Sequence, residues 1–157
     1  MGQRLSFRRV TLRLHPLEDS IIDRACEALN GVERSLLVQE GVLAETNRLG
    51  IRWSMVRPPP LTEPWPYLPQ RGDEPTEARV CISVSLPLAE LIRRGAQHVR
   101  ASEPQFVIGS TLAYVGRLQR CFEGLCAETP HEGQKMRVEL QRIKIPPQYQ
   151  YRSRRAK

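Results

Sequence analysis

The chain has 157 residues, of which 40% are hydrophobic and 6% aromatic, and its formal net charge is +7. This hydrophobic content is enough to form the core of a domain, and the scarcity of aromatic residues favours small helical packing over a large β-sandwich. The four cysteines contain no C-x-x-C pair and the three histidines are far apart. We therefore expect no metal site and no cofactor.

No segment of the sequence indicates export or membrane insertion. The chain does not open on a basic segment followed by an apolar stretch, and no run of eighteen apolar residues occurs in it. A cytoplasmic protein with free thiols is therefore expected. The sequence also lacks the G-x-S-x-G, H-E-x-x-H and P-loop motifs, so we do not expect an enzyme.

Basic side chains are concentrated at both ends of the chain. Residues 133–157 contain eight basic side chains and one acidic side chain, and the first thirteen residues contain four arginines and no acid. Such a distribution is expected when the partner is a polyanion, although a tail that only improves solubility is the alternative. We assign residues 1–7 to a basic N-terminal arm and residues 127–157 to a basic C-terminal tail.

The sequence repeats itself at an offset of 70 residues. Residues 9–14 align with residues 79–84, and both segments alternate apolar and polar side chains, as half-buried strands do. The apolar positions of the next two segments also coincide at this offset. Each copy therefore predicts one strand followed by two helices, in units at 8–50 and 78–126. Pro16 and Pro87 differ by 71, so the joint between strand and helix is expected to shift by one residue.

Proline, glycine and acidic residues set the expected helix ends. Pro16 begins a helix that runs to about residue 29, and Gly31 and Gly50 bracket a second helix over about 32–49. In the second copy, Pro87 begins the first helix. The sequence 102–105 is a capping box that begins the last helix, which runs to about residue 122.

A proline-rich segment separates the two copies. Seven prolines occur between residues 57 and 75, with Trp65 and Tyr67 among them. The composition predicts an extended, semi-rigid linker over residues 51–77. A ligand for an SH3-like domain is the alternative.

Neither predicted strand has a partner within its own copy, and a single short strand is not stable in water. The two strands are therefore expected to pair antiparallel, with one apolar face packed on the helices. That face would contain Val10, Leu12, Leu14, Val80, Ile82 and Val84. The fold class predicted is mostly α with a short two-stranded antiparallel β-ribbon. Taken alone, either strand could be an ordinary edge strand with solvated arginines, but the repeat favours the ribbon.

The sequence Gly31-Val32-Glu33-Arg34-Ser35 between the two helices of the first copy resembles the turn of the ribbon-helix-helix DNA-binding family. The resemblance implies a tandem ribbon-helix-helix that forms a pseudo-dimer in one chain, hence a monomer with internal pseudo-two-fold symmetry that binds double-stranded DNA. The ribbon would enter the major groove. Its implied base-reading residues are Arg9, Thr11, Arg13, Arg79, Cys81, Ser83 and Ser85. Because the two strands differ, the DNA site is not expected to be a true palindrome.

The resemblance, together with the basic ends, also implies phosphate contacts. The expected residues are Arg8, Arg34, Ser35, Ser102, Gln105, Arg152, Arg154 and Arg155. The second copy departs from the family turn, because Pro104 lacks the N–H group that would bind a phosphate. Arg34 and Ser35 have an alternative role as an ordinary charge and cap at a helix start.

In its single-chain tandem architecture, its proline-rich connection and its basic tail, the chain is similar to ribbon-helix-helix proteins that bind the overdrive enhancer of tumour-inducing plasmids. This similarity implies a role in plasmid or T-DNA transfer, with a partner ATPase or relaxase-type transfer protein. The alternatives are a ribbon-helix-helix transcriptional repressor and an antitoxin-like or adaptor protein. For the last, residues 136–145 alternate apolar and polar side chains and predict a possible extra strand.

Overall fold

The computed structural model describes residues 7–52, 59–69, 78–123, 135 and 138–150. Most of these residues are helical, and the sheet has two antiparallel strands, as the sequence predicts. The order of strand, helix and helix occurs twice along the chain. The elements are β1 (Phe7–Leu14), α1 (Pro16–Ala28), α2 (Arg34–Arg48), β2 (Ala78–Ser85), α3 (Leu86–Val99), α4 (Glu103–Glu123) and the 3-10 helix η1 (Pro147–Tyr149).

The joint between strand and helix is equivalent in the two copies. His15 caps α1 and Ser85 caps α3, and these residues lie 70 apart, so the predicted shift of one residue is wrong. The two prolines differ by 71 because Pro16 is the first residue of α1 whereas Pro87 is the second residue of α3. Both positions tolerate proline, since neither N–H group is used within the helix.

The turn before α2 is longer than the sequence predicts. Asn30 and Gly31 adopt left-handed backbone conformations with φ of 61° and 75°. The N–H of Gly31 donates to the carbonyl of Cys26 at 2.9 Å, which closes the end of α1. Helix α2 therefore begins at Arg34, two residues after the predicted start.

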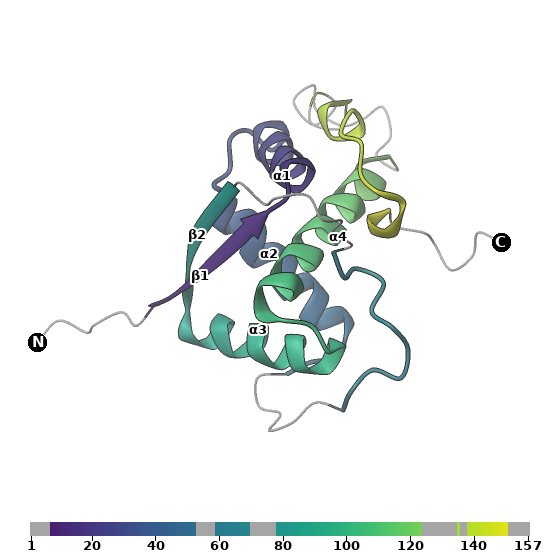
Figure 1. Ribbon diagram of the computed structural model, residues 1–157. Helices are drawn as coiled ribbons and strands as arrows, with labels where there is room; N and C mark the ends of the chain where they lie inside the picture. Colours follow the sequence, from purple (N-terminus) through teal and green to yellow (C-terminus); the bar gives the residue numbers. More distant parts are fainter. Residues whose placement is uncertain (1–6, 53–58, 70–77, 124–134, 136–137, 151–157) are drawn as a thin grey trace, which may run out of the picture.

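The four helices pack against one face of the ribbon, with α4 in contact with β1 and α2 in contact with β2 (Figure 1). The strands pair in register from Phe7 opposite Ser85 to Leu14 opposite Ala78. Leu12, Leu14, Ile82 and Val84 are buried on the helical side, and Val10 and Val80 are half-buried. The predicted apolar face is therefore confirmed.

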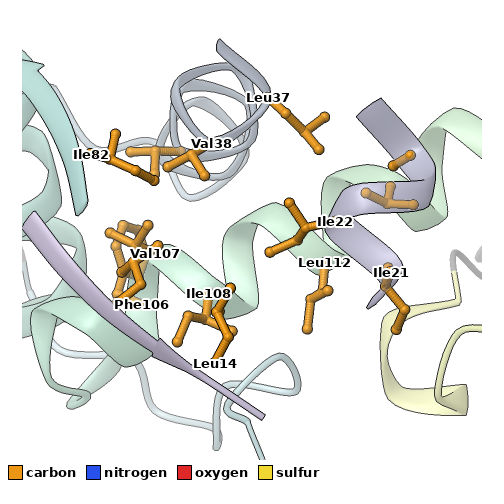
Figure 2. Close-up of a cluster of buried hydrophobic side chains, with 14 of the residues drawn as sticks. Leu14, Ile21, Ile22, Leu37, Val38, Ile82, Phe106, Val107, Ile108 and Leu112 are labelled. Carbon is orange, nitrogen blue, oxygen red and sulfur yellow. The ribbon is translucent and has the colours of Figure 1, made fainter. Parts of the chain in front are cut away.

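Figure 2 shows how the ribbon joins the core. Leu14 of β1 lies near Ile108 of α4, and Ile82 of β2 lies near Val38 of α2. Phe106 is fully buried in the same cluster. Burial of these side chains holds the strands in one register, because a slip of one residue would turn every apolar side chain of a strand to solvent.

Helices α2 and α4 approach each other closely at Gly41 and Thr111. A Cβ atom on Gly41 would lie 2.9 Å from the Cα of Thr111, a distance that real Cβ atoms do not show. The two residues are 70 positions apart. The crossing therefore joins positions that the sequence repeat makes equivalent.

The described part of the proline-rich segment belongs to the core, which corrects the prediction of an extended linker. Trp65 is 5% exposed, and its ring centroid lies 5.3 Å from that of Phe106. The indole comes so close to Gly109 that a Cβ atom there would lie 2.7 Å from it. The N–H of Leu61 also donates to the carbonyl of His98 at 2.9 Å. Burial of the indole outweighs the tendency of prolines to keep the segment extended in solvent.

The C-terminal segment also packs on the helices. Residues 138–141 are helical, so the predicted strand over 136–145 is wrong for the residues described. Leu140, Ile143 and Ile145 are buried. Gln119 of α4 donates from Nε2 to the carbonyls of Leu140 and Ile143 at 2.7 and 2.8 Å. A helical turn is favoured because these carbonyls find a donor on α4 and the apolar side chains find a core.

No helix in the described part of the chain combines the length and the apolar character needed to cross a membrane.

Candidate nucleic-acid interface

The outward face of the ribbon is exposed and contains every side chain predicted to read bases. These seven side chains come from alternate positions of β1 and β2, as the two-residue period requires. Phe7, which is not among the predicted base-reading residues, extends the same face by one more position of β1. All eight are exposed: Phe7, Arg9, Thr11, Arg13, Arg79, Cys81, Ser83 and Ser85.

The register distributes the arginines unevenly along the ribbon. Thr11 lies opposite Cys81 at the centre of the face, with Oγ1 3.6 Å from Sγ. On one side of this pair Arg13 lies opposite Arg79, and on the other side Arg9 lies opposite Ser83. One end of the face therefore has two arginines and the other end has one. Each end contains residues of both strands, so it is the ends of the ribbon that differ in charge.

The charge of this face is entirely positive. Three of the eight outward side chains are arginines and none is acidic. In the described part of the chain, neither Arg9 nor Arg79 forms an ion pair with a carboxylate. Because like charges placed directly opposite each other repel, an anion at the end formed by Arg13 and Arg79 would be stabilising.

Arg8 lies on the other face of β1 and is paired with a carboxylate. Its guanidinium donates to both oxygens of Glu103, at 3.1 and 3.4 Å. Glu103 is the first residue of α4, so this ion pair joins β1 to the start of that helix. A phosphate contact by Arg8 would have to displace Glu103.

The start of α4 is closed by its own side chains. The N–H of Gln105 donates to Oγ of Ser102 at 3.2 Å, and the N–H of Ser102 donates to Oε1 of Gln105 at 3.1 Å. This is the predicted capping box, and it occupies both residues that were expected to bind phosphate there. With Pro104 lacking an N–H and the Glu103 carboxylate close by, this helix end is poorly suited to an anion.

The start of α2 also has a carboxylate, that of Glu33, but it has no side-chain cap. Its N-cap residue, Glu33, makes no side-chain hydrogen bond to the first turn. The guanidinium of Arg34, however, bonds to Asp19 at 3.0 Å and to Asp23, and the hydrogen bond to Asp23 raises the pKa of Arg34. The side chain of Arg34 thus ties α2 to α1, and the N–H groups of Arg34 and Ser35 are the groups left to meet a phosphate.

The remaining predicted phosphate contacts, Arg152, Arg154 and Arg155, lie outside the described residues. Within the described residues, no group of three or more histidine, cysteine or acidic side chains is placed to hold a metal ion. Cys26 is buried, and burial raises the pKa of its thiol, whereas Cys81 is exposed on the ribbon.

Phe7 could have been found from the sequence, because the alternation of β1 continues back from Arg9 to this residue. The partners of Arg8 and Arg34 could not, since their carboxylates lie in other elements. In the comparisons with known proteins, no family model, no curated protein and no solved structure matches this chain.

Proposed function

We propose that this chain binds double-stranded DNA sequence-specifically, as a tandem ribbon-helix-helix pseudo-dimer that places its β-ribbon in the major groove. The observation that carries the proposal is the outward face of β1 and β2, which presents three arginines, three hydroxyls and one thiol, with no carboxylate. One of these hydroxyls, that of Ser85, also caps α3. The major groove of B-DNA admits a two-stranded ribbon, and arginine is the side chain best suited to bidentate contact with guanine.

The size of the ribbon fits this role. Each strand has eight residues. At about 3.4 Å per residue the strands extend over roughly 27 Å, which corresponds to about eight base pairs of B-DNA. The outward face is thus long enough to contact both halves of a short site.

Two contacts support the pseudo-dimer. Thr11 pairs with Cys81 in the ribbon, and Gly41 meets Thr111 where α2 crosses α4. In each contact the partners are 70 residues apart, as a two-fold axis relating the copies would require. One chain provides both strands of the ribbon, so we propose that the monomer binds DNA.

The two helix starts next to the ribbon are proposed to contact the DNA backbone unequally. The N–H groups of Arg34 and Ser35 at the start of α2 would bind a phosphate, whereas the capped start of α4 would contribute little. Binding of the DNA backbone would then be stronger on one side of the site.

For the cellular role, we propose plasmid or T-DNA transfer at an enhancer of the overdrive type, with a partner ATPase or relaxase-type transfer protein. This part rests on the similarity to tandem ribbon-helix-helix proteins. A transcriptional repressor would use the same ribbon. The adaptor alternative depended on a free strand after residue 136, and the burial of Leu140, Ile143 and Ile145 against the chain's own core removes that argument.

A gel-retardation assay at physiological salt tests the proposal. Wild-type protein is compared with a variant in which Arg9, Arg13 and Arg79 are replaced by alanine. A control variant replaces Arg24, Arg52 and Lys144, which are exposed outside the ribbon, and so loses the same charge. We expect the ribbon variant to lose its preference for specific duplexes and the control to keep it. Equal loss in both variants would indicate general electrostatic binding only.

A further inference from the structure

Phe7 is the one large apolar side chain on the outward face of the ribbon. It lies directly opposite Ser85, at the end of the ribbon farthest from the pair formed by Arg13 and Arg79. Its residue is 57% exposed, more than any other large hydrophobic residue in the described part of the chain. No ring of that part stacks on it.

The burial pattern of β1 explains this exposure. Alternation places Phe7 with Arg9 and Thr11 on the outward face, while Arg8 turns to the helical side and pairs with Glu103. The ion pair of Arg8 links β1, next to Phe7, to the start of α4. The phenyl ring therefore extends from an ordered strand, with Ser85 as its cross-strand neighbour.

A solvent-exposed phenyl ring on a face that reads DNA needs an apolar partner on the DNA. The major groove offers one such group at each A·T pair, the C5-methyl of thymine. Phe7 and Arg9 are two positions apart, or about 7 Å along the strand, which corresponds to about two base pairs. Phe7 would therefore meet bases beyond those that Arg9 reaches.

We propose that Phe7 is a specificity-determining residue that contacts the C5-methyl group of a thymine at one end of the DNA site. This inference rests on the proposed function. It gives the site a direction, with guanines favoured near Arg13 and Arg79 and a thymine favoured near Phe7 and Ser85. Between these ends lie Arg9 and the small side chains of Thr11, Cys81 and Ser83.

The test uses DNA in which single thymines of a selected duplex are replaced by deoxyuridine, which lacks only the methyl group. Wild-type protein should bind about three- to five-fold more weakly when the thymine near Phe7 is replaced, as expected for one buried methyl group. Phe7→Ala should bind the thymine and uridine duplexes equally. Leu43→Ala, which removes an exposed apolar side chain from α2, should respond to uridine like the wild type.

A further arm identifies the group recognised. With cytosine at the same position, 5-methylcytosine should restore binding by wild type and leave Phe7→Ala unaffected, because the methyl group occupies the same place. If Phe7→Ala keeps the wild-type discrimination between thymine and uridine, Phe7 does not contact the methyl group. If instead the wild type fails to prefer the selected duplex over a scrambled one, the proposed function fails, and the assignment of Phe7 with it.

Discussion

Thr11 and Cys81 face each other across the ribbon, with Oγ1 3.6 Å from Sγ, and the 70-residue repeat makes them equivalent positions. In an antiparallel pair related by a two-fold axis, only the residue on the axis lies opposite its own equivalent. Gly41 and Thr111 meet the same condition at the crossing of α2 and α4. Both contacts thus join positions that the sequence repeat aligns.

This pairing makes a direct prediction for Thr11→Cys. Facing side chains in an antiparallel ribbon have Cβ atoms about 4.5 to 5.5 Å apart, and a disulfide needs about 3.5 to 4.5 Å. A small movement should therefore allow the introduced thiol to form a disulfide with Cys81 under mild oxidation. Because both strands belong to one chain, the product should migrate as a monomer on a non-reducing gel, and sedimentation should give one chain per particle.

The wild type, which has a thiol only on the β2 side of this pair, is the control and should not form a disulfide across the ribbon. A covalent dimer of Thr11→Cys would mean that the ribbon forms between two chains, and it would contradict the single-chain pseudo-dimer.

Arg13→Ala and Ser83→Ala should affect opposite ends of the DNA site. Loss of Arg13 removes one of the two facing arginines, and we expect a cost of roughly 1 to 3 kcal/mol in specific binding with relaxed preference at one or two base pairs. Ser83→Ala should cost less and relax the other end, because a hydroxyl is only weakly selective. Competition with single-base variants of the site measures both effects, and an unaltered preference in Arg13→Ala would exclude base contact by Arg13.

Gly41→Ala should destabilise the fold. The added methyl group would meet the backbone of Thr111, and the helices would have to separate, at a cost of about 1 to 3 kcal/mol in the free energy of unfolding. Asn47→Ala, at an exposed position of the same helix, should change stability by less than about 0.5 kcal/mol. Urea denaturation of both variants measures the difference. Equal stability of Gly41→Ala and wild type would show that α2 and α4 do not approach so closely.

The elements of the fold were predictable because their signals are local and repeated. Alternation at 9–14 and 79–84 predicted the two strands, and their antiparallel pairing followed from the need to bury Leu12, Leu14 and their counterparts. The end of α1 was visible in Asn30 and Gly31. The start of the second helix of the first copy was not predictable from local signals, since the length of the turn depends on how α2 packs.

The parts that the sequence did not predict depend on distant partners. Trp65 occurs among prolines, and only the close approach at Gly109 and the neighbouring Phe106 shows that it belongs to the core. Residues 138–145 have the alternation of a strand, yet Gln119 stabilises a helical turn there. In the candidate site, Arg8 and Arg34 were expected to bind phosphate, but Glu103, Asp19 and Asp23 lie beside them.

The basic tail is expected to strengthen binding to all duplexes alike. Tyr149 is buried, so a truncation that tests the tail should keep residues up to 150. It then removes Arg152, Arg154, Arg155 and Lys157. If these side chains bind phosphates, the slope of log K against log salt concentration should decrease by about 0.9 for each phosphate that the truncated protein no longer neutralises. An unchanged slope would show that the tail has no part in DNA binding.

Selection of bound duplexes from a random pool tests the central claim most directly. The ribbon should recover one short motif of about eight base pairs, without palindromic symmetry, in which guanine contacts by Arg13 and Arg79 dominate one end. The variant that lacks Arg9, Arg13 and Arg79 should recover no motif, whereas the charge-matched control should recover that of the wild type. A wild-type pool without enrichment, or the same motif recovered by the ribbon variant, would contradict recognition of DNA by this face.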